Sequence, residues 1–282
     1  MVRLERHIDR MRTLILVLCL VLAAWGVAQE EGDPEDYVPS TLLESARNDD
    51  IEGIRRALQQ GTHIDITNVN GWSAAAFAVT SGNINALHAL IDAGIDLNQA
   101  TTEGRTPLMF AAQQGDKEMV ESLLAANADP SITTDEGISA YEVAVESGRK
   151  IVALQIAEAC VLRGIYNDDP DLITISIKRG AYINIPTPAG WTALIYATSS
   201  GNELLSKELV KLGADVNRAE NDGWTPLHFA AHNGHKAIVD LLLRNGANTV
   251  YYSKSGSLAR DLALASGFQA VHDMIPEPDQ DL

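Results

Sequence analysis

Cysteine is almost missing from this chain, which has only Cys19 and Cys160 among its 282 residues. Two cysteines exclude the disulfide-rich scaffolds that hold many small secreted domains together. Aromatic residues are also scarce, at 5% of the sequence, although 46% of it is hydrophobic. The apolar residues are therefore largely alanine and leucine, which favours thin layers of paired helices packed through small side chains.

Basic side chains are outnumbered, with 21 lysines and arginines against 38 acidic residues and a net charge of −17. This balance argues against binding to nucleic-acid backbones or to anionic membrane surfaces, and it favours basic partners. Motifs for chemistry are missing too, since the sequence has no nucleophile elbow, phosphate loop or histidine–cysteine pairing. Cys160 falls in an apolar stretch and is expected to be a small core residue. We therefore expect no enzyme and no cofactor.

A long hydrophobic run occurs only near the start, over Thr13–Ala28, after an arginine-rich stretch. This layout is typical of a signal peptide, because the run is short of the roughly 20 residues that span a bilayer comfortably. Residues 1–28 are interpreted as a cleaved signal or an uncleaved N-terminal anchor, and residues 29–40 as an acidic linker. Leu18 is not the small residue that a lipidated cysteine requires before it. A single remaining cysteine fits a bacterial periplasmic protein better than a small eukaryotic secreted one.

Glycine recurs every 33 residues in three separate phases. A period near 33 indicates one supersecondary unit stacked many times, which is a solenoid. The series are Gly71, Gly104, Gly137, Gly190, Gly223 and Gly256; Gly61, Gly94, Gly180, Gly213 and Gly246, with Asn127 at one position; and Gly82, Gly115, Gly148, Gly201, Gly234 and Gly267.

The clearest unit is Asn221–Asn248. Thr225 is a predicted N-cap, and Pro226 follows at the first helical position. Proline is tolerated there because the N–H that it lacks would have no partner within the helix. Gly234 ends this helix, and a second helix is predicted over Lys236–Arg244 from its apolar spacing.

This unit resembles the ankyrin repeat. The matching residues are Gly223, Thr225, Pro226, Leu227, His228, Ala230, Ala231, Gly234, His235, Leu241, Leu242, Leu243, Gly246, Ala247 and Asn248. Gly104–Leu108 and Gly213–Asn217 match nearly as well, and the resemblance covers about Thr41 to Ile275. It implies an all-α solenoid with short β-turn fingers, about seven to eight repeats with degenerate polar caps, and a protein as the partner.

The glycine rhythm breaks once in each series, between Gly148 and Gly180, so that one finger is lost. We expect a single helix over Lys150–Arg163 to serve as the second helix of one repeat and the first of the next. The resulting division of the chain is a first ankyrin block at 41–148, a joining helix at 149–166, a second block at 167–276 and an acidic tail at 277–282.

The resemblance places the partner-binding residues on the fingers and at the ends of the first helices, along a polar, acidic stripe with spaced tryptophans. Tryptophan is favoured at binding hot spots, although packing on a neighbouring finger is the alternative role. The predicted residues are Trp72, Glu103, Arg105, Gln113, Gln114, Asp135, Ile138, Trp191, Asn221, Asp222, Trp224 and His232.

Two side-chain groups imitate metal sites. His228, His232 and His235 need not share one helix face, and two of them stand at ordinary ankyrin positions. The aspartates at 49–50 and 168–169 precede second helices, where capping explains them, and the spacing of a calcium loop is lacking. We expect no metal.

Together these features predict a non-enzymatic, monomeric scaffold in the periplasm. Its fingers and concave inner helices would bind a protein with a basic or apolar segment. We expect neither nucleic acid nor, after signal cleavage, a membrane as a partner. The alternative is a secreted ankyrin effector directed at a host.

Overall fold

A computed structural model describes residues 41–277, which lie within the unit Ser40–Leu282. The predicted signal, the acidic linker and positions 278–282 lie outside the described residues. No strand is assigned in 41–277, only two isolated bridges. The helices are α2 (Thr41–Arg47), α3 (Ile51–Gln59), α4 (Ala74–Thr80), α5 (Ile84–Asp92), α6 (Pro107–Gln114), α7 (Lys117–Ala125), α8 (Ala140–Glu146), α9 (Lys150–Asn167), α10 (Pro170–Lys178), α11 (Ala193–Ser200), α12 (Glu203–Lys211), α13 (Pro226–His232), α14 (Lys236–Arg244), α15 (Ala259–Ala265) and α16 (Gln269–His272).

Short polar side chains start the helices, as the repeat pattern predicts. Thr192 Oγ1 accepts a hydrogen bond from the backbone N–H of Ile195 at 3.3 Å at the start of α11. Asp169 Oδ1 accepts from the N–H of Leu172 at 2.9 Å at the start of α10. Each bond satisfies one of the N–H groups that a helix leaves unpaired in its first turn.

Asp49 and Asp168 stand 33 residues before Gly82 and Gly201, in the glycine series that ends first helices. Both aspartates adopt the left-handed conformation, with φ of 56° and 58°. Asp49 Oδ1 accepts from the N–H of Ala86 at 2.9 Å, and Asp168 accepts from the hydroxyl of Tyr196. These carboxylates are used within the fold, so capping and turn formation account for them.

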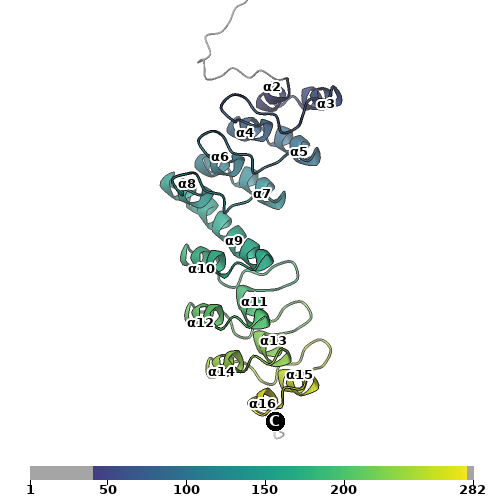
Figure 1. Cartoon of the computed structure of the whole chain (residues 1–282), viewed down its shortest axis with the longest axis vertical. Helices are drawn as coiled ribbons and strands as arrows, with labels where there is room; N and C mark the ends of the chain where they lie inside the picture. The colour runs from purple at the N-terminus through teal and green to yellow at the C-terminus, as the bar shows by residue number, and fades with distance from the viewer. Residues whose placement is uncertain (1–40, 278–282) are drawn as a thin grey trace, which may run out of the picture. The chain divides into compact units, whose positions relative to one another are not determined.

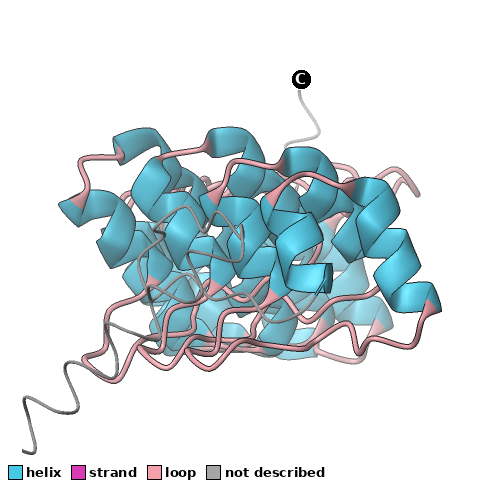
Figure 2. Cartoon of the chain, turned by 90° about the horizontal axis from the view of Figure 1, so that it is seen from above, coloured by secondary structure: helices cyan, strands magenta, loops and turns pink. Residues whose placement is uncertain are grey.

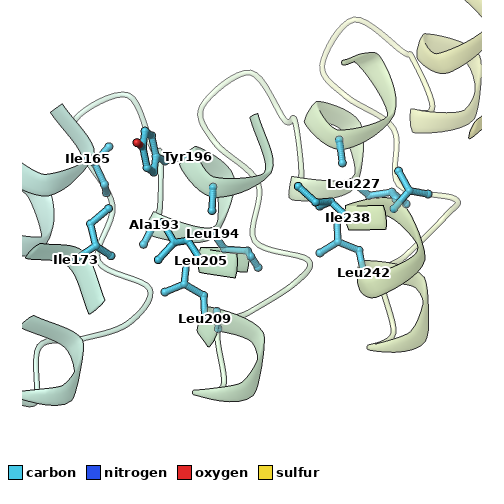
Figure 3. Close-up of a cluster of buried hydrophobic side chains, with 14 of the residues drawn as sticks. Ile165, Ile173, Ala193, Leu194, Tyr196, Leu205, Leu209, Leu227, Ile238 and Leu242 are labelled. Atoms are coloured by element: carbon cyan, nitrogen blue, oxygen red, sulfur yellow. The ribbon is translucent and has the colours of Figure 1, made fainter. Parts of the chain in front are cut away.

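The core is continuous from one helix pair to the next, because each first helix packs against the first helices before and after it. In the second block it is built from side chains such as Leu194, Leu209, Leu227 and Leu242, each at most 1% exposed (Figure 3). No single repeat could bury these side chains alone, which is why the units are stable only when stacked.

Six fingers precede the first helices, numbered one to six by Gly71, Gly104, Gly137, Gly190, Gly223 and Gly256. Backbone hydrogen bonds join fingers one and two, four and five, and five and six. The N–H of Thr102 donates to Asn70 O at 2.9 Å, and that of Lys254 donates to Asp222 O at 2.9 Å. The long loops that form the fingers run along the lower edge of the view in Figure 2.

A second set of bonds joins the bases of successive fingers, and we call it the base ladder. In each rung a side-chain oxygen accepts a backbone N–H from the base of the next finger. The rungs are Asp65 to Asp96 at 2.8 Å, Asn98 to Asp129 at 2.7 Å, Asn184 to Asp215 at 2.9 Å and Asn217 to Asn248 at 2.7 Å.

Neither set has a bond across the interruption within the described residues. Ser131 occupies the ladder position that Asp65 and Asn98 hold, and its hydroxyl donates to Asp129 beside it. In finger four, the residue equivalent to Thr102 is Pro188, which has no N–H to donate. A Cβ at Gly137 of finger three would meet no atom within 4 Å, whereas one at Gly104 would lie 3.1 Å from Thr134 of the next finger. The described fingers therefore form two separate rows of three.

One helix spans the break: α9 has 18 residues and ends at Asn167. It packs against α7 and α8 of the first block and against α10 and α11 of the second. It is thus a second helix relative to α7 and a first helix relative to α11. As a result, the two layers exchange sides: α3, α5 and α7 lie on the right in Figure 1, and α10, α12 and α14 lie on the left.

Side chains tie the blocks together where fingers three and four do not meet. The hydroxyl of Tyr141 on α8 donates to Arg179 O at the end of α10, at 2.9 Å. The Arg179 guanidinium lies 4.7 Å from the centre of the Tyr141 ring and pairs with Glu142. We call these three residues the junction clamp.

Candidate functional site

Five of the predicted partner-binding residues come together in the first block. Fingers two and three, with α6 and α8, enclose an open groove of about 510 Å³, which we call the finger groove. Predicted residues that line it are Glu103, Arg105, Gln113, Asp135 and Ile138.

The finger groove is acidic. Its lining includes Glu103, Asp135, Glu136 and Glu146 against one basic residue, Arg105. A hydrogen bond from the Thr134 side chain holds the pKa of Glu136 below its usual value, so this carboxylate is charged at neutral pH.

The one arginine of the groove already has partners within the protein. Its guanidinium donates to Gln113 Oε1 at 2.6 Å and lies 4.4 Å from the centre of the Phe110 ring. Ile138 and Val143 are half-buried and supply an apolar part of the lining. The groove therefore offers carboxylates around an apolar patch, which suits a segment with cationic and apolar side chains.

Other predicted residues are engaged in bonds within the array. Gln114 Nε2 donates to Thr80 O at 2.8 Å, and Asn221 Nδ2 donates to Pro188 O at 2.9 Å. Asp222 accepts the bond from Lys254 through its backbone oxygen, and His232 Nδ1 lies 2.9 Å from Ser266 Oγ. The side chains of Asn221, Asp222 and His232 remain exposed, and their contact with a partner stays a prediction.

The fingertip tryptophans are half-buried and stack on phenylalanines of the inner helices. The Trp72 ring lies 5.3 Å from that of Phe77 and 4.8 Å from that of Phe110. Trp191 and Trp224 both pack on Phe229, at 5.0 and 5.1 Å. Packing was the alternative role considered for these residues, and each ring does pack on a phenylalanine of an inner helix. Contact of the tryptophans with a partner stays a prediction.

Six groove residues are missing from the predicted set: Thr102, Thr134, Glu136, Val143, Glu146 and Ser147. Val143 and Ser147 follow Ser139 at four-residue steps, so helical spacing along α8 was a usable signal. Thr134 is buried within its finger, and nothing in its sequence position marks it as lining a groove.

The three histidines near α13 are not gathered around a common point. His228 Nδ1 accepts from the Thr225 N–H at 3.2 Å, so its Nε2–H donates to Ser257 O at 3.2 Å. His235 Nε2 lies 3.3 Å from Ser199 O. In residues 41–277 no group of three histidine, cysteine or acidic side chains is placed to hold a metal ion.

Cys160 lies in the core of α9, where burial raises the pKa of its thiol to about 11. The thiol is therefore protonated at neutral pH and is a poor nucleophile. None of the helices in the described part of the chain is both long and apolar enough to cross a membrane.

Comparison with known proteins supports the repeat architecture. The family described as Ankyrin repeats (3 copies) matches residues 42–135 and 156–252. The crystal structure of the human ASB11 ankyrin repeat domain is similar at 24% identity, with a TM-score of 0.39, covering 86% of this chain and 99% of that one. No curated protein matches the sequence.

Proposed function

The chain belongs to the ankyrin-repeat family, whose repeats bind other proteins, and from this premise we propose that the finger groove holds a basic segment of a partner protein. The observation that carries the proposal is the meeting of Glu103, Asp135 and Ile138 in one open groove. Acidic side chains and an apolar patch then face the same bound segment. The protein acts as a non-enzymatic, monomeric scaffold.

Charge reversal in the groove tests this proposal. The double variant Asp135→Lys/Glu136→Lys reverses two exposed carboxylates, and we expect it to weaken binding by about tenfold or more, because like charges across an interface cost several kcal/mol. Partners cross-linked to fingers two and three of the intact protein are quantified by mass spectrometry for wild type and variant.

The matched control is Asp92→Lys/Glu118→Lys, which reverses two exposed acids outside the groove and leaves the net charge equal to that of the test variant. If the control variant captures the partner as well as the wild type does, the result supports recognition by the finger groove. If both double variants lose the partner equally, binding depends only on overall charge and the proposal is wrong.

The proposed place of action is the bacterial periplasm. Support comes from the charge-free run Thr13–Ala28 after an arginine-rich start, and from the single cysteine outside that run. Cell fractionation tests the location. Recovery of the protein only from culture medium or host cells would favour the secreted effector instead.

A further inference from the structure

The interruption leaves a groove at the point where the finger bases of the two blocks fail to meet. It measures about 540 Å³ and lies between α7 and α9. Pro130, from the last finger base of the first block, and Ile185, from the first finger base of the second, both line it. The groove thus occupies the place of the missing rung of the base ladder, and we call it the junction groove.

The lining of the junction groove is largely apolar. Leu124 comes from α7, Ala159 and Leu162 come from α9, and Pro130 and Ile185 come from the finger bases. Exposed large apolar side chains are frequent along the same stretch of chain, and they include Ile151, Leu154, Tyr166, Ile175 and Tyr182. Tyr166, which also lines the groove, is 66% exposed. An exposed aromatic side chain on an open, largely apolar groove is typical of an interaction site.

The junction groove carries acceptor groups that have no partner among the described residues. Glu121 and Glu158 line it, and neither forms an ion pair with any residue in 41–277. The basic residue of the lining is Arg163. Its guanidinium forms an ion pair with Asp129 at 2.5 Å, so it does not neutralise Glu121 or Glu158. Gln155 also lines the groove, and its buried Oε1 accepts no hydrogen bond within the described chain. A buried acceptor without a donor is costly, so an occupant that donates hydrogen bonds is favoured.

We propose that the junction groove binds a protein segment in which an apolar side chain is flanked by lysine or arginine. The apolar side chain packs against Leu124, Ala159 and Leu162, and the cations face Glu121 and Glu158. This surface shares no residue with the finger groove. The chain therefore has two separate binding surfaces, one of which exists only because a finger is lost.

A short fluorescent peptide with a leucine-rich core flanked by lysines is the probe, and the intact protein is titrated against it by fluorescence anisotropy. Glu158→Lys reverses a rim charge, and Ala159→Arg fills the floor. We expect each variant to weaken peptide binding by about tenfold. Asp92→Lys is the matched charge control and should bind as wild type does. Thermal unfolding checks that the variants fold. If Ala159→Arg fails to fold, Glu158→Lys still tests the proposal, because Glu158 is only half-buried.

Two further measurements separate this proposal from the one for the finger groove. A peptide with glutamates in place of the lysines should not bind, and equal binding of the two peptides would overturn the proposal. The variant Glu136→Lys alters only the finger groove. If it abolishes peptide binding while Glu158→Lys has no effect, the junction groove is not a binding site, and the finger groove remains supported.

Discussion

The two blocks share one plan, yet their ends lie in different surroundings. Both rows of three fingers stop at a residue that cannot continue the base ladder, Ser131 in the first block and Val250 in the second. Within residues 41–277, the last finger of the second block is followed by α15 and α16, whereas the last finger of the first block is followed by α8, α9 and a whole second block. An array can therefore end in mid-chain when a continuous helix takes over the core.

The blocks also differ in how they use the position after the proline–leucine pair of the repeat. The first block has Met109 and Glu142 there, and the second has Ile195 and His228. Glu142 belongs to the junction clamp, while His228 joins two fingers within its own block. The same fold position thus serves to link blocks in one case and to link fingers in the other.

The largest change in stability where the two blocks join is expected from Gly164→Ala. Exchanging glycine for alanine within a helix usually stabilises by about 0.5–1 kcal/mol. Here the added Cβ would lie 2.6 Å from Ile173 Cγ1 and 2.9 Å from the backbone oxygen of Asp169. We expect a loss of about 1–3 kcal/mol, typical of overpacking, measured by denaturant unfolding.

Combining Gly164→Ala with Ile173→Ala gives the control, because the second change removes the nearest contact. The double variant should lose less stability than the sum of the single variants. A raised melting temperature for Gly164→Ala alone would mean that α9 and α10 are not packed as closely as described.

A smaller effect is expected from Arg179→Ala, which removes the ion pair and the ring contact of the junction clamp. Both charged side chains are about one-third exposed, at 30% and 31%, so water screens part of the interaction. We expect a loss of about 1–2 kcal/mol. Hydrogen exchange should show faster exchange in α8 and α10, with fingers five and six unchanged.

Lys178→Ala is the neighbouring control. Lys178 pairs with Glu208 at 3.0 Å, but this pair lies within the second block and is more exposed. We expect less than about 1 kcal/mol from its loss. Equal effects of the two variants would argue that the junction clamp does nothing specific to connect the blocks.

The smallest effect is a pH dependence confined to the second block. Burial lowers the pKa of His228 below its ordinary value of 6.5, so the folded state favours the neutral ring. The unfolded chain then binds more protons below this value, and the stability contribution present above pH 6.5 is lost as the pH falls through the lowered pKa.

Hydrogen exchange at pH 7 and at mildly acidic pH measures this difference. Fingers five and six should lose protection in acid while fingers one and two do not. His228→Gln should remove the difference between the blocks. If the variant keeps the wild-type pH dependence, another group is responsible.

Part of the candidate site was predictable from the sequence. Glu103, Asp135 and Ile138 stand at equivalent or adjacent finger positions, so the repeat period alone brings them to one surface. The engagement of Gln114 and Asn221 in hydrogen bonds with neighbouring repeats was not predictable. Such bonds depend on side-chain directions across repeats, which the period does not specify.

The sequence by itself determined the stacked architecture and the place of its interruption. The glycine phases mark turns, and the change of step after Gly148 marks the lost finger, because local backbone conformation depends on nearby residues. The sequence also marks the ends of the ladder, through Ser131 and Val250. Only the tertiary structure decided that α9 moves from one helix layer to the other, and that the two finger bases stand apart. Both follow from how α9 packs on four helices at once, and packing between distant residues has no local signal.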